Sequence, residues 1–169
     1  MTRLRRILLC LILLALAGGR GDAALFGGEH NAFEAAEKSF SLGVWDRAER
    51  EFAEFIEKYP KSEGRAAAVS FQAQALFQQQ KFAAVVALLN RHQAEAGKLA
   101  DEYLYWIGTA EFQNTNYPGA AAAFGKLARE FRESSRRMAG AVGEAAARAK
   151  LGDWPAVVAL LQPPDGAFR

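Results

Sequence analysis

Cysteine, histidine and proline are scarce in this 169-residue sequence, and each scarcity excludes a class of protein. The only cysteine, Cys10, lies in an apolar N-terminal run, so the rest of the chain has no thiol for a disulfide, a thiolate metal site or a cysteine nucleophile. Apolar residues continue after Cys10 and no small residue precedes it, which argues against a lipid anchor there. Only 5 prolines occur, and no segment alternates polar and apolar residues with period two. An all-helical protein is therefore expected.

The first residues have the layout of a secretory signal peptide. Arg3, Arg5 and Arg6 precede an apolar run at 7–17, and small residues lead up to Ala23. As a helix this run is about 16 Å long, whereas the hydrocarbon core of a bilayer is about 30 Å thick. We therefore predict a signal peptide over 1–23, a short linker over 24–28, and export to the periplasm or cell envelope. The alternative is an N-terminal membrane anchor that is not cleaved.

The charge balance excludes a nucleic-acid partner. The whole chain has 21 basic and 19 acidic residues, and removal of 1–23 leaves 17 basic and 18 acidic, a net charge of −1. A protein that binds the phosphate backbone needs a basic surface. The expected partner is therefore a protein or peptide, and any contact with a membrane is expected only through an uncleaved leader.

An internal repeat organises the rest of the sequence. The six residues AVVALL occur at 84–89 and again at 156–161, and four aromatic residues are spaced by 37, 35 and 37 positions. A small residue lies nine positions before each aromatic, and a large apolar residue lies seven positions after it. The aromatics are Trp45, Phe82, Tyr117 and Trp154; the small residues are Ala36, Ala73, Gly108 and Ala145; the large residues are Phe52, Leu89, Phe124 and Leu161.

These spacings fit pairs of antiparallel helices, which need small residues where the backbones cross and large ones between them. Gly43 and Gly152 fit left-handed turns at helix ends, and Pro118 and Pro155 fit the first turn of a helix. Ser62 and Ser134 are predicted to be N-caps, and each aromatic is expected to close the small core at its turn. The predicted helices are 29–42, 45–59, 63–79, 82–94, 99–114, 117–133, 135–151 and 154–162.

The repeat unit resembles the tetratricopeptide repeat, most clearly in residues 103–131, where Ile107, Gly108, Tyr117, Ala120 and Phe124 occupy signature positions. This resemblance implies a right-handed α-α superhelix. Its units are expected at 29–62, 66–99, 101–134 and 138–162, with a tail at 163–169 that continues in a longer protein. The steps of 35 and 37 are most similar to the envelope members of the family, the BamD-like outer-membrane assembly lipoproteins and the Tol-Pal-associated periplasmic repeat proteins. The fourth unit departs from the pattern, because Glu144 stands where leucine is usual.

The sequence predicts no catalytic, cofactor-binding or metal site. The two histidines, His30 and His92, belong to different units, and His92 is expected to be a solvated residue at a helix end. Glu54 and Lys58 have the spacing of a charged outer helix face. There is no glycine-rich phosphate loop, serine nucleophile elbow or two-histidine metal motif. We therefore do not expect an enzyme, unless a histidine meets a carboxylate and a cleft in space.

The resemblance implies that the first helix of each unit lines a concave groove. A mixed aromatic and polar row suits an extended peptide or a partner helix. The alternative is that the aromatic residues pack between neighbouring repeats. Lysine and asparagine do not occur at the positions where co-chaperone members clamp a terminal carboxylate, which disfavours that ligand class. The predicted groove residues are Phe33, Glu37, Phe40, Ser70, Gln74, Phe77, Tyr105, Thr109, Phe112 and Lys150, with Val142 and Ala146 completing the row.

Two further features bear on partners. Arg132, Arg136 and Arg137 are clustered at one junction, where a solvated loop is expected and contact with lipid or an acidic partner is the alternative. No polar capping helix follows the fourth unit, although repeat arrays usually need one. The sequence thus predicts a non-enzymatic binding scaffold of the cell envelope. The alternatives are a self-assembling repeat protein and a membrane-anchored subunit of an envelope complex.

Overall fold

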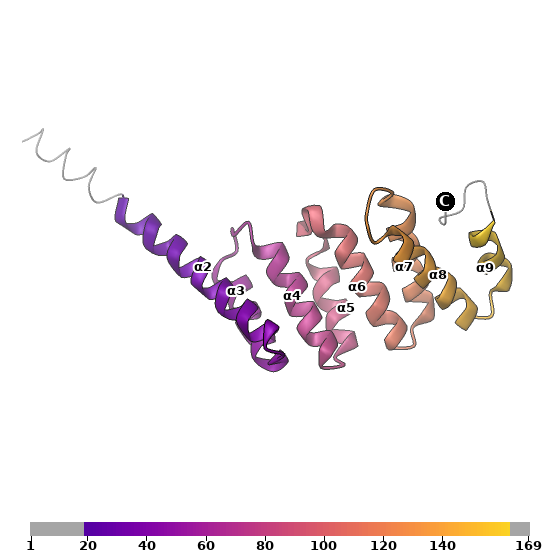
Figure 1. The fold of residues 1–169 in the computed structure, drawn as a ribbon, viewed down its shortest axis with the longest axis horizontal. Helices are drawn as coiled ribbons and strands as arrows, with labels where there is room; N and C mark the ends of the chain where they lie inside the picture. Colours follow the sequence, from indigo (N-terminus) through magenta and orange to yellow (C-terminus); the bar gives the residue numbers. More distant parts are fainter. Residues whose placement is uncertain (1–18, 163–169) are drawn as a thin grey trace, which may run out of the picture.

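The structure, a computed structural model, describes the backbone of residues 19–162 and the side chains of residues 27–162. Eight α-helices and no strand make up the described backbone, and they form four consecutive hairpins (Figure 1). Two short 3-10 turns lie between the second and third hairpins. The elements are α2 (Gly19–Ser41), α3 (Trp45–Lys58), α4 (Arg65–Gln78), α5 (Phe82–Arg91), η1 (Gln93–Glu95), η2 (Gly97–Leu99), α6 (Ala100–Gln113), α7 (Tyr117–Glu130), α8 (Arg137–Lys150) and α9 (Trp154–Leu161).

The predicted hairpins are confirmed, and the differences concern helix ends. The helix predicted to begin at residue 29 begins at Gly19, so it runs through the segment expected to be a linker. Ala23, Ala24 and Leu25 are strong helix formers, and the two glycines that follow them cost only about 1 kcal/mol each in a helix. The predicted signal peptide lies mostly outside the described residues, and the 163–169 tail lies entirely outside them.

All four hairpin turns have the same backbone geometry. The turn residue has a positive φ in each: 72° at Gly43, 61° at Gln80, 59° at Thr115 and 74° at Gly152. In each turn the amide of the residue after this one donates a hydrogen bond to the carbonyl five residues before it, in the preceding helix. Val44, for example, donates to Ser39 at 3.0 Å. This is the Schellman arrangement predicted from the two glycines. The other two turns adopt it without glycine.

The starts of the second helices are confirmed, and the predicted serine N-caps are wrong. The Asn116 side chain accepts from the amide of Gly119 and the Asp153 side chain from that of Ala156, each at 3.3 Å, with proline in the first turn. Ser62 and Ser134 instead lie in the turns before α4 and α8, whose N-cap residues are Gly64 and Arg136. Each serine oxygen accepts an amide two residues ahead at 3.0 Å and donates at 2.5 Å to a carboxylate of its own hairpin, Glu29 or Asp101.

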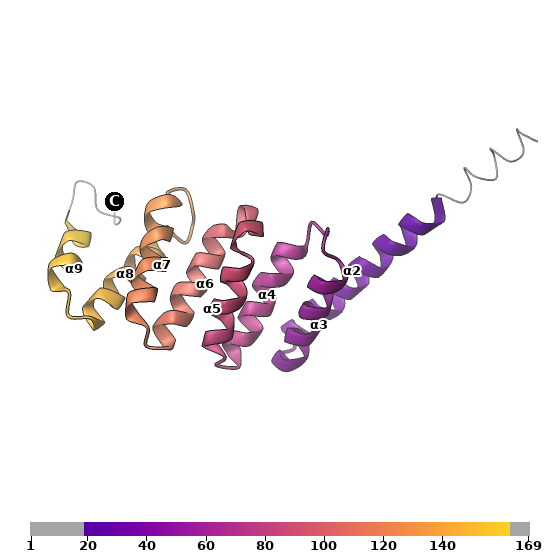
Figure 2. The ribbon, with the colours of Figure 1, turned by 180° about the vertical axis from the view of Figure 1, so that it is seen from behind.

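The helices form two layers. The first helices, α2, α4, α6 and α8, lie on the side seen in Figure 1, and the second helices, α3, α5, α7 and α9, lie on the side seen in Figure 2. Each first helix contacts the next first helix, whereas no two second helices within the described residues have comparable contact. The layer of first helices is therefore the inner, more tightly packed side of the array, and we call its exposed surface the inner face.

Small residues allow the close approach of helices that the sequence predicts. Ala36, Ala48 and Ala73 are fully buried. The ring of Phe124 on α7 lies between two glycines, because a Cβ on Gly108 of α6 would be 2.7 Å from the ring and one on Gly143 of α8 would be 2.6 Å from it. An alanine at either site would require the buried ring to move.

The predicted aromatic at each turn closes the core in three of the four hairpins. Trp45 meets Phe40, Phe82 meets Phe77 and Tyr117 meets Phe112, edge to face with centroids 5.2–5.3 Å apart. In the fourth hairpin Ala149 stands where the other hairpins have phenylalanine, and Trp154 is 62% exposed.

The polar Glu144 is accommodated in the fourth hairpin by an ion-pair cluster. Its side chain is 1% exposed and accepts from Arg148 at 2.9 and 3.0 Å and from Arg129 at 3.2 and 3.3 Å. Gly125 leaves room for the carboxylate, since a Cβ there would be 2.7 Å from Oε2. The hydrogen bonds that Arg148 donates to Glu144 raise the pKa of Arg148, and its hydrogen bond to Asp153 at 3.0 Å contributes.

Candidate functional site

The aromatic residues of the predicted groove belong to the packed interior. Phe33 contacts the rings of Phe52, Phe55 and Phe71, with centroids 5.2–6.2 Å apart. Phe40, Phe77 and Phe112 pair with the aromatic residues at the turns. Tyr105 meets Trp106 at 5.5 Å and Phe124 at 6.4 Å. The alternative interpretation, packing within and between repeats, is therefore the one seen for these rings.

Three polar residues of the predicted row hydrogen bond within the protein. Ser70 is 2% exposed and donates to Glu102 of the next first helix. Gln74 donates to the Ser70 hydroxyl at 3.2 Å and to Glu102 at 3.3 Å. Thr109 donates at 2.8 Å to the Tyr105 carbonyl of its own helix. Glu102 also accepts from Arg136 at 2.8 Å, so this network ties α4, α6 and the start of α8 together.

The exposed members are Glu37, Ala146, Val142 and Lys150. Lys150 does not continue the Phe40, Phe77, Phe112 series, since the matching residue in the fourth hairpin is Ala149. It continues instead a series of exposed polar residues that the sequence analysis passed over. We call this series the rim row; it consists of Ser41, Gln78, Gln113 and Lys150.

The rim row lies at the C-terminal ends of the four first helices, one residue beyond the half-buried aromatic or alanine. Two amides and an ammonium group supply hydrogen-bond donors and acceptors without a concentration of charge. The Ser41 hydroxyl donates at 2.9 Å to the Lys38 carbonyl of its own helix and remains an acceptor. The spacing of 37, 35 and 37, already visible for the aromatics, would have identified these residues. Such a row is suited to a peptide main chain, which offers alternating donors and acceptors.

Hollows occur at the other ends of the hairpins, where one hairpin joins the next. One hollow is lined by the ends of α5 and α7 and the start of α6, with Leu104 and Phe131 among apolar residues and Arg91 and Lys126 among charged ones. A second shares Phe131 and adds the charged residues around 129–133. The arginines predicted to be solvated differ there: Arg132 is exposed, but Arg136 is half-buried and pairs with Glu102.

The prediction that His92 is solvated is wrong. Its residue is 9% exposed, and its Nδ1 lies 3.2 Å from Glu95, which also pairs with Arg65. Burial and the charges of Arg65 and Arg91 lower the pKa of His92. The 3-10 turn after α5 folds the histidine inward, which the sequence could not show. His30 is exposed and lies 3.2 Å from Glu34 in the next turn of α2.

His30, which pairs with Glu34, also lines a hollow with Glu29, Phe33, Phe55 and Gly64, so one histidine meets both a carboxylate and a hollow. The hollow beside Glu95 contains Ser62, whose hydroxyl is engaged with Glu29. Among the described side chains, no three histidine, cysteine or acidic residues converge in a way that could hold a metal ion. Within the described helices, none combines the length and the apolar character needed to cross a bilayer.

The comparison with known families agrees with the hairpin geometry. The tetratricopeptide repeat profile matches residues 32–62 and 102–134, which correspond to the first and third hairpins. No curated protein matches the chain. The two matched segments share their turn geometry, core positions and aromatic pairs with the second hairpin between them. The described residues form an all-α solenoid of four helical hairpins, and the first and third of these hairpins match the tetratricopeptide repeat.

Proposed function

We propose that this protein is a non-enzymatic protein-binding scaffold of the cell envelope, and that it binds an extended peptide or a partner helix along its inner face. Tetratricopeptide repeats in general mediate contacts between proteins. The observation that carries the finer proposal is the rim row, which presents one polar side chain per hairpin while the neighbouring aromatics are used in the core.

The spacing of the rim row suits a peptide main chain. Neighbouring packed helices are about 8–10 Å apart, and an extended peptide advances about 3.3 Å per residue. A ligand lying across the first helices would therefore meet one rim side chain at about every third residue. Main-chain hydrogen bonds of this kind favour an extended segment over one particular charged sequence, and Glu37 and Lys150 at opposite ends of the array would set its direction.

The proposed location depends on the N-terminal sequence. The basic residues and apolar run before Ala23 support export, and the repeat steps of 35 and 37 support likeness to the BamD-like and Tol-Pal-associated envelope proteins. Cell fractionation with N-terminal sequencing of the isolated protein tests both points. A new terminus near Ala24 is expected for a cleaved exported protein, an intact leader in the membrane fraction would support the anchored subunit, and recovery in the cytoplasm would contradict the proposal.

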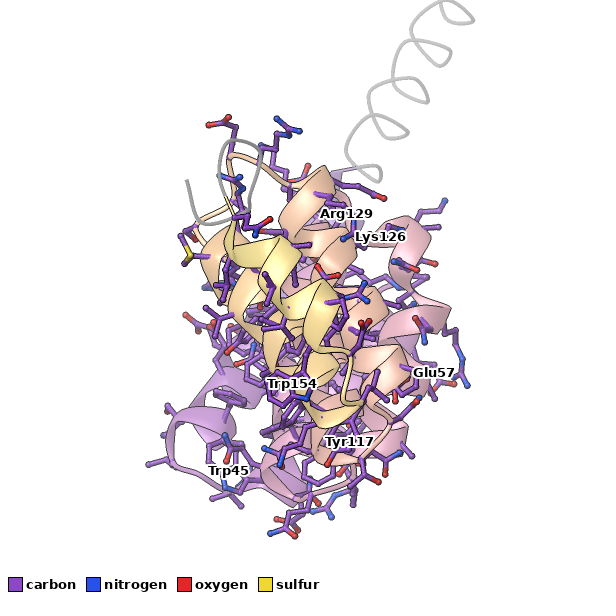
Figure 3. All side chains as sticks on the ribbon, turned by 90° about the vertical axis from the view of Figure 1, so that its right-hand side faces the viewer. Trp45, Glu57, Tyr117, Lys126, Arg129 and Trp154 are labelled. Atoms are coloured by element: carbon purple, nitrogen blue, oxygen red, sulfur yellow. The ribbon has the colours of Figure 1, made fainter. Side chains whose placement is uncertain are left out.

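Site-specific photo-crosslinking tests the binding surface. A photoreactive residue would replace Gln78 or Gln113 on the inner face, and a control would replace Glu57, an exposed residue of α3 in the other layer (Figure 3). We expect a discrete partner to be captured in envelope extracts from the two inner positions and not from Glu57. The Gln78→Ala, Gln113→Ala double variant should bind that partner at least tenfold more weakly. Equal capture from all three positions would contradict the proposal.

A further inference from the structure

The last hairpin exposes apolar side chains on the side that each earlier hairpin packs against its successor. Val142 of α8 and Trp154, Val158 and Leu161 of α9 are 51–62% exposed. The three α9 residues follow one another at i, i+4 and i+7, so they share one helix face. We call these four residues the end face; Figure 3 looks onto this end of the array, with Trp154 on the helix nearest the viewer.

The repeat register shows what this surface is built to contact. The residues that match Leu161 in the first three hairpins are Phe52, Leu89 and Phe124, which are 0%, 0% and 5% exposed. Two of them meet the following hairpin directly. Phe52 stacks on Phe71 of α4 with centroids 5.2 Å apart, and Phe124 packs on Gly143 of α8. Leu161, 58% exposed, occupies the same position with no hairpin beyond it among the described residues.

At the opposite end of the array, the corresponding positions of α2 are polar. The positions through which α4, α6 and α8 contact the preceding hairpin hold Ala68, Tyr103 and Gly140 at one level, Phe71, Trp106 and Gly143 at the next, and Ala75, Ala110 and Ala147 at the third. In α2 these levels hold Asn31, Glu34 and Lys38, all of them exposed. Head-to-tail stacking of two copies would bury these charged groups against apolar side chains, which is unfavourable.

We propose that the end face is the interface of a homodimer, in which two copies pack their α8–α9 hairpins against each other about a twofold axis. The end face of one copy then meets the apolar end face of the other instead of the polar Asn31, Glu34 and Lys38 positions of α2. A twofold contact of this kind is closed, because it uses the same surface on both copies. Four half-exposed apolar side chains amount to roughly 400 Å² on each copy, so the dimer needs the surrounding residues of both hairpins to reach the roughly 1,000 Å² of a specific interface.

Sedimentation velocity tests the proposal directly. The purified protein should pass from monomer to dimer as its concentration rises from about 1 to about 100 µM, without larger species. Leu161→Glu should weaken dimerisation more than tenfold, because it places a charge in the centre of the interface. Leu42→Glu is the matched control: Leu42 is 68% exposed at the first hairpin turn, so this variant should dimerise like the wild type. Circular dichroism establishes that both variants are folded.

Disulfide trapping then gives the orientation. In a Cys10→Ser background, which has no other thiol, Val158→Cys should form a covalent dimer with itself. Glu34→Cys should not do so, alone or mixed with the Val158→Cys protein. A crosslink between these two variants would show head-to-tail stacking and overturn the proposal. A wild-type protein that stays monomeric at all concentrations would also overturn it, and would indicate that another segment or another protein covers the end face. Neither Leu161 nor Val158 belongs to the rim row, so these results leave the proposed peptide binding to its own test.

Discussion

Replacement of Glu144 separates the contribution of a buried charge from that of the space it fills. The carboxylate is 1% exposed, but its partners reach solvent: the Arg129 side chain is 62% exposed and that of Arg148 is 31% exposed. Removal of one member of a fully buried ion pair costs about 3–5 kcal/mol, because the other charge is left without a partner. Here the remaining guanidinium groups can be hydrated, and Arg148 keeps Asp153 at 3.0 Å. We therefore expect Glu144→Ala to lower the free energy of unfolding by about 2 kcal/mol.

Glu144→Leu should cost less than Glu144→Ala, about 0–1 kcal/mol, because it fills the same space with an apolar side chain and needs no desolvation of a charge. Leucine is also the residue that the family resemblance leads one to expect at this position. Glu144→Gln should fall between the two, since it retains an acceptor for the arginines. Urea denaturation followed by far-UV circular dichroism gives the three values. The control is Glu54→Ala on an exposed helix face, expected to change stability by no more than about 0.5 kcal/mol.

Two results would refute this reasoning. If Glu144→Leu were as destabilising as Glu144→Ala, the charge itself would be essential to the fourth hairpin. If Glu144→Ala behaved like Glu54→Ala, the buried carboxylate would contribute no stability.

The remaining predictions use the same unfolding assay. Thr115→Gly should stabilise the protein by about 0.5–1 kcal/mol, since a β-branched residue there has a φ of 59°, and destabilisation would contradict the strain argument. Gly143→Ala should destabilise by about 1 kcal/mol through the contact with the buried ring of Phe124, whereas Gly27→Ala, with nothing within 4 Å, should stabilise; equal effects would contradict the packing. Because the pKa of folded His92 lies below 6.5, the unfolded chain takes up the proton first, and stability should fall as the pH drops from 6.5 through that lower value. His92→Gln should remove this slope, and an unchanged slope would exclude His92 as its source.

The repeat spacing predicts most of the fold, because each hairpin obeys the same packing constraint. A small residue at Ala36 or Gly108 and a large one at Phe52 or Phe124 are needed wherever two helices cross closely, so the sequence repeats them. The helix ends are less predictable. α2 continues through Gly27 and Gly28, and the turn at Thr115 adopts a conformation that its residue type disfavours.

Most of the predicted binding residues are not exposed, because the repeat register gives the position of a residue along its helix and not its exposure. Phe40 and Phe77 lie at positions associated with the groove, yet the aromatic at each turn draws them into the core. Ser70 is polar, but a carboxylate from the next hairpin satisfies its hydroxyl inside the protein. Ser70 and Glu102 are 32 positions apart, so no local pattern records their pairing. The exposed rim row lies one residue beyond the predicted Phe40, Phe77 and Phe112 in three helices, and in α8 the predicted Lys150 belongs to it.

The contacts between hairpins have a consequence for bending. Each second helix packs against the first helix of the next hairpin, and neighbouring first helices also meet. Ser70, Gln74 and Glu102 add hydrogen bonds between neighbouring hairpins on the inner side. A ligand that lengthened or shortened the inner side would therefore have to work against both sets of contacts.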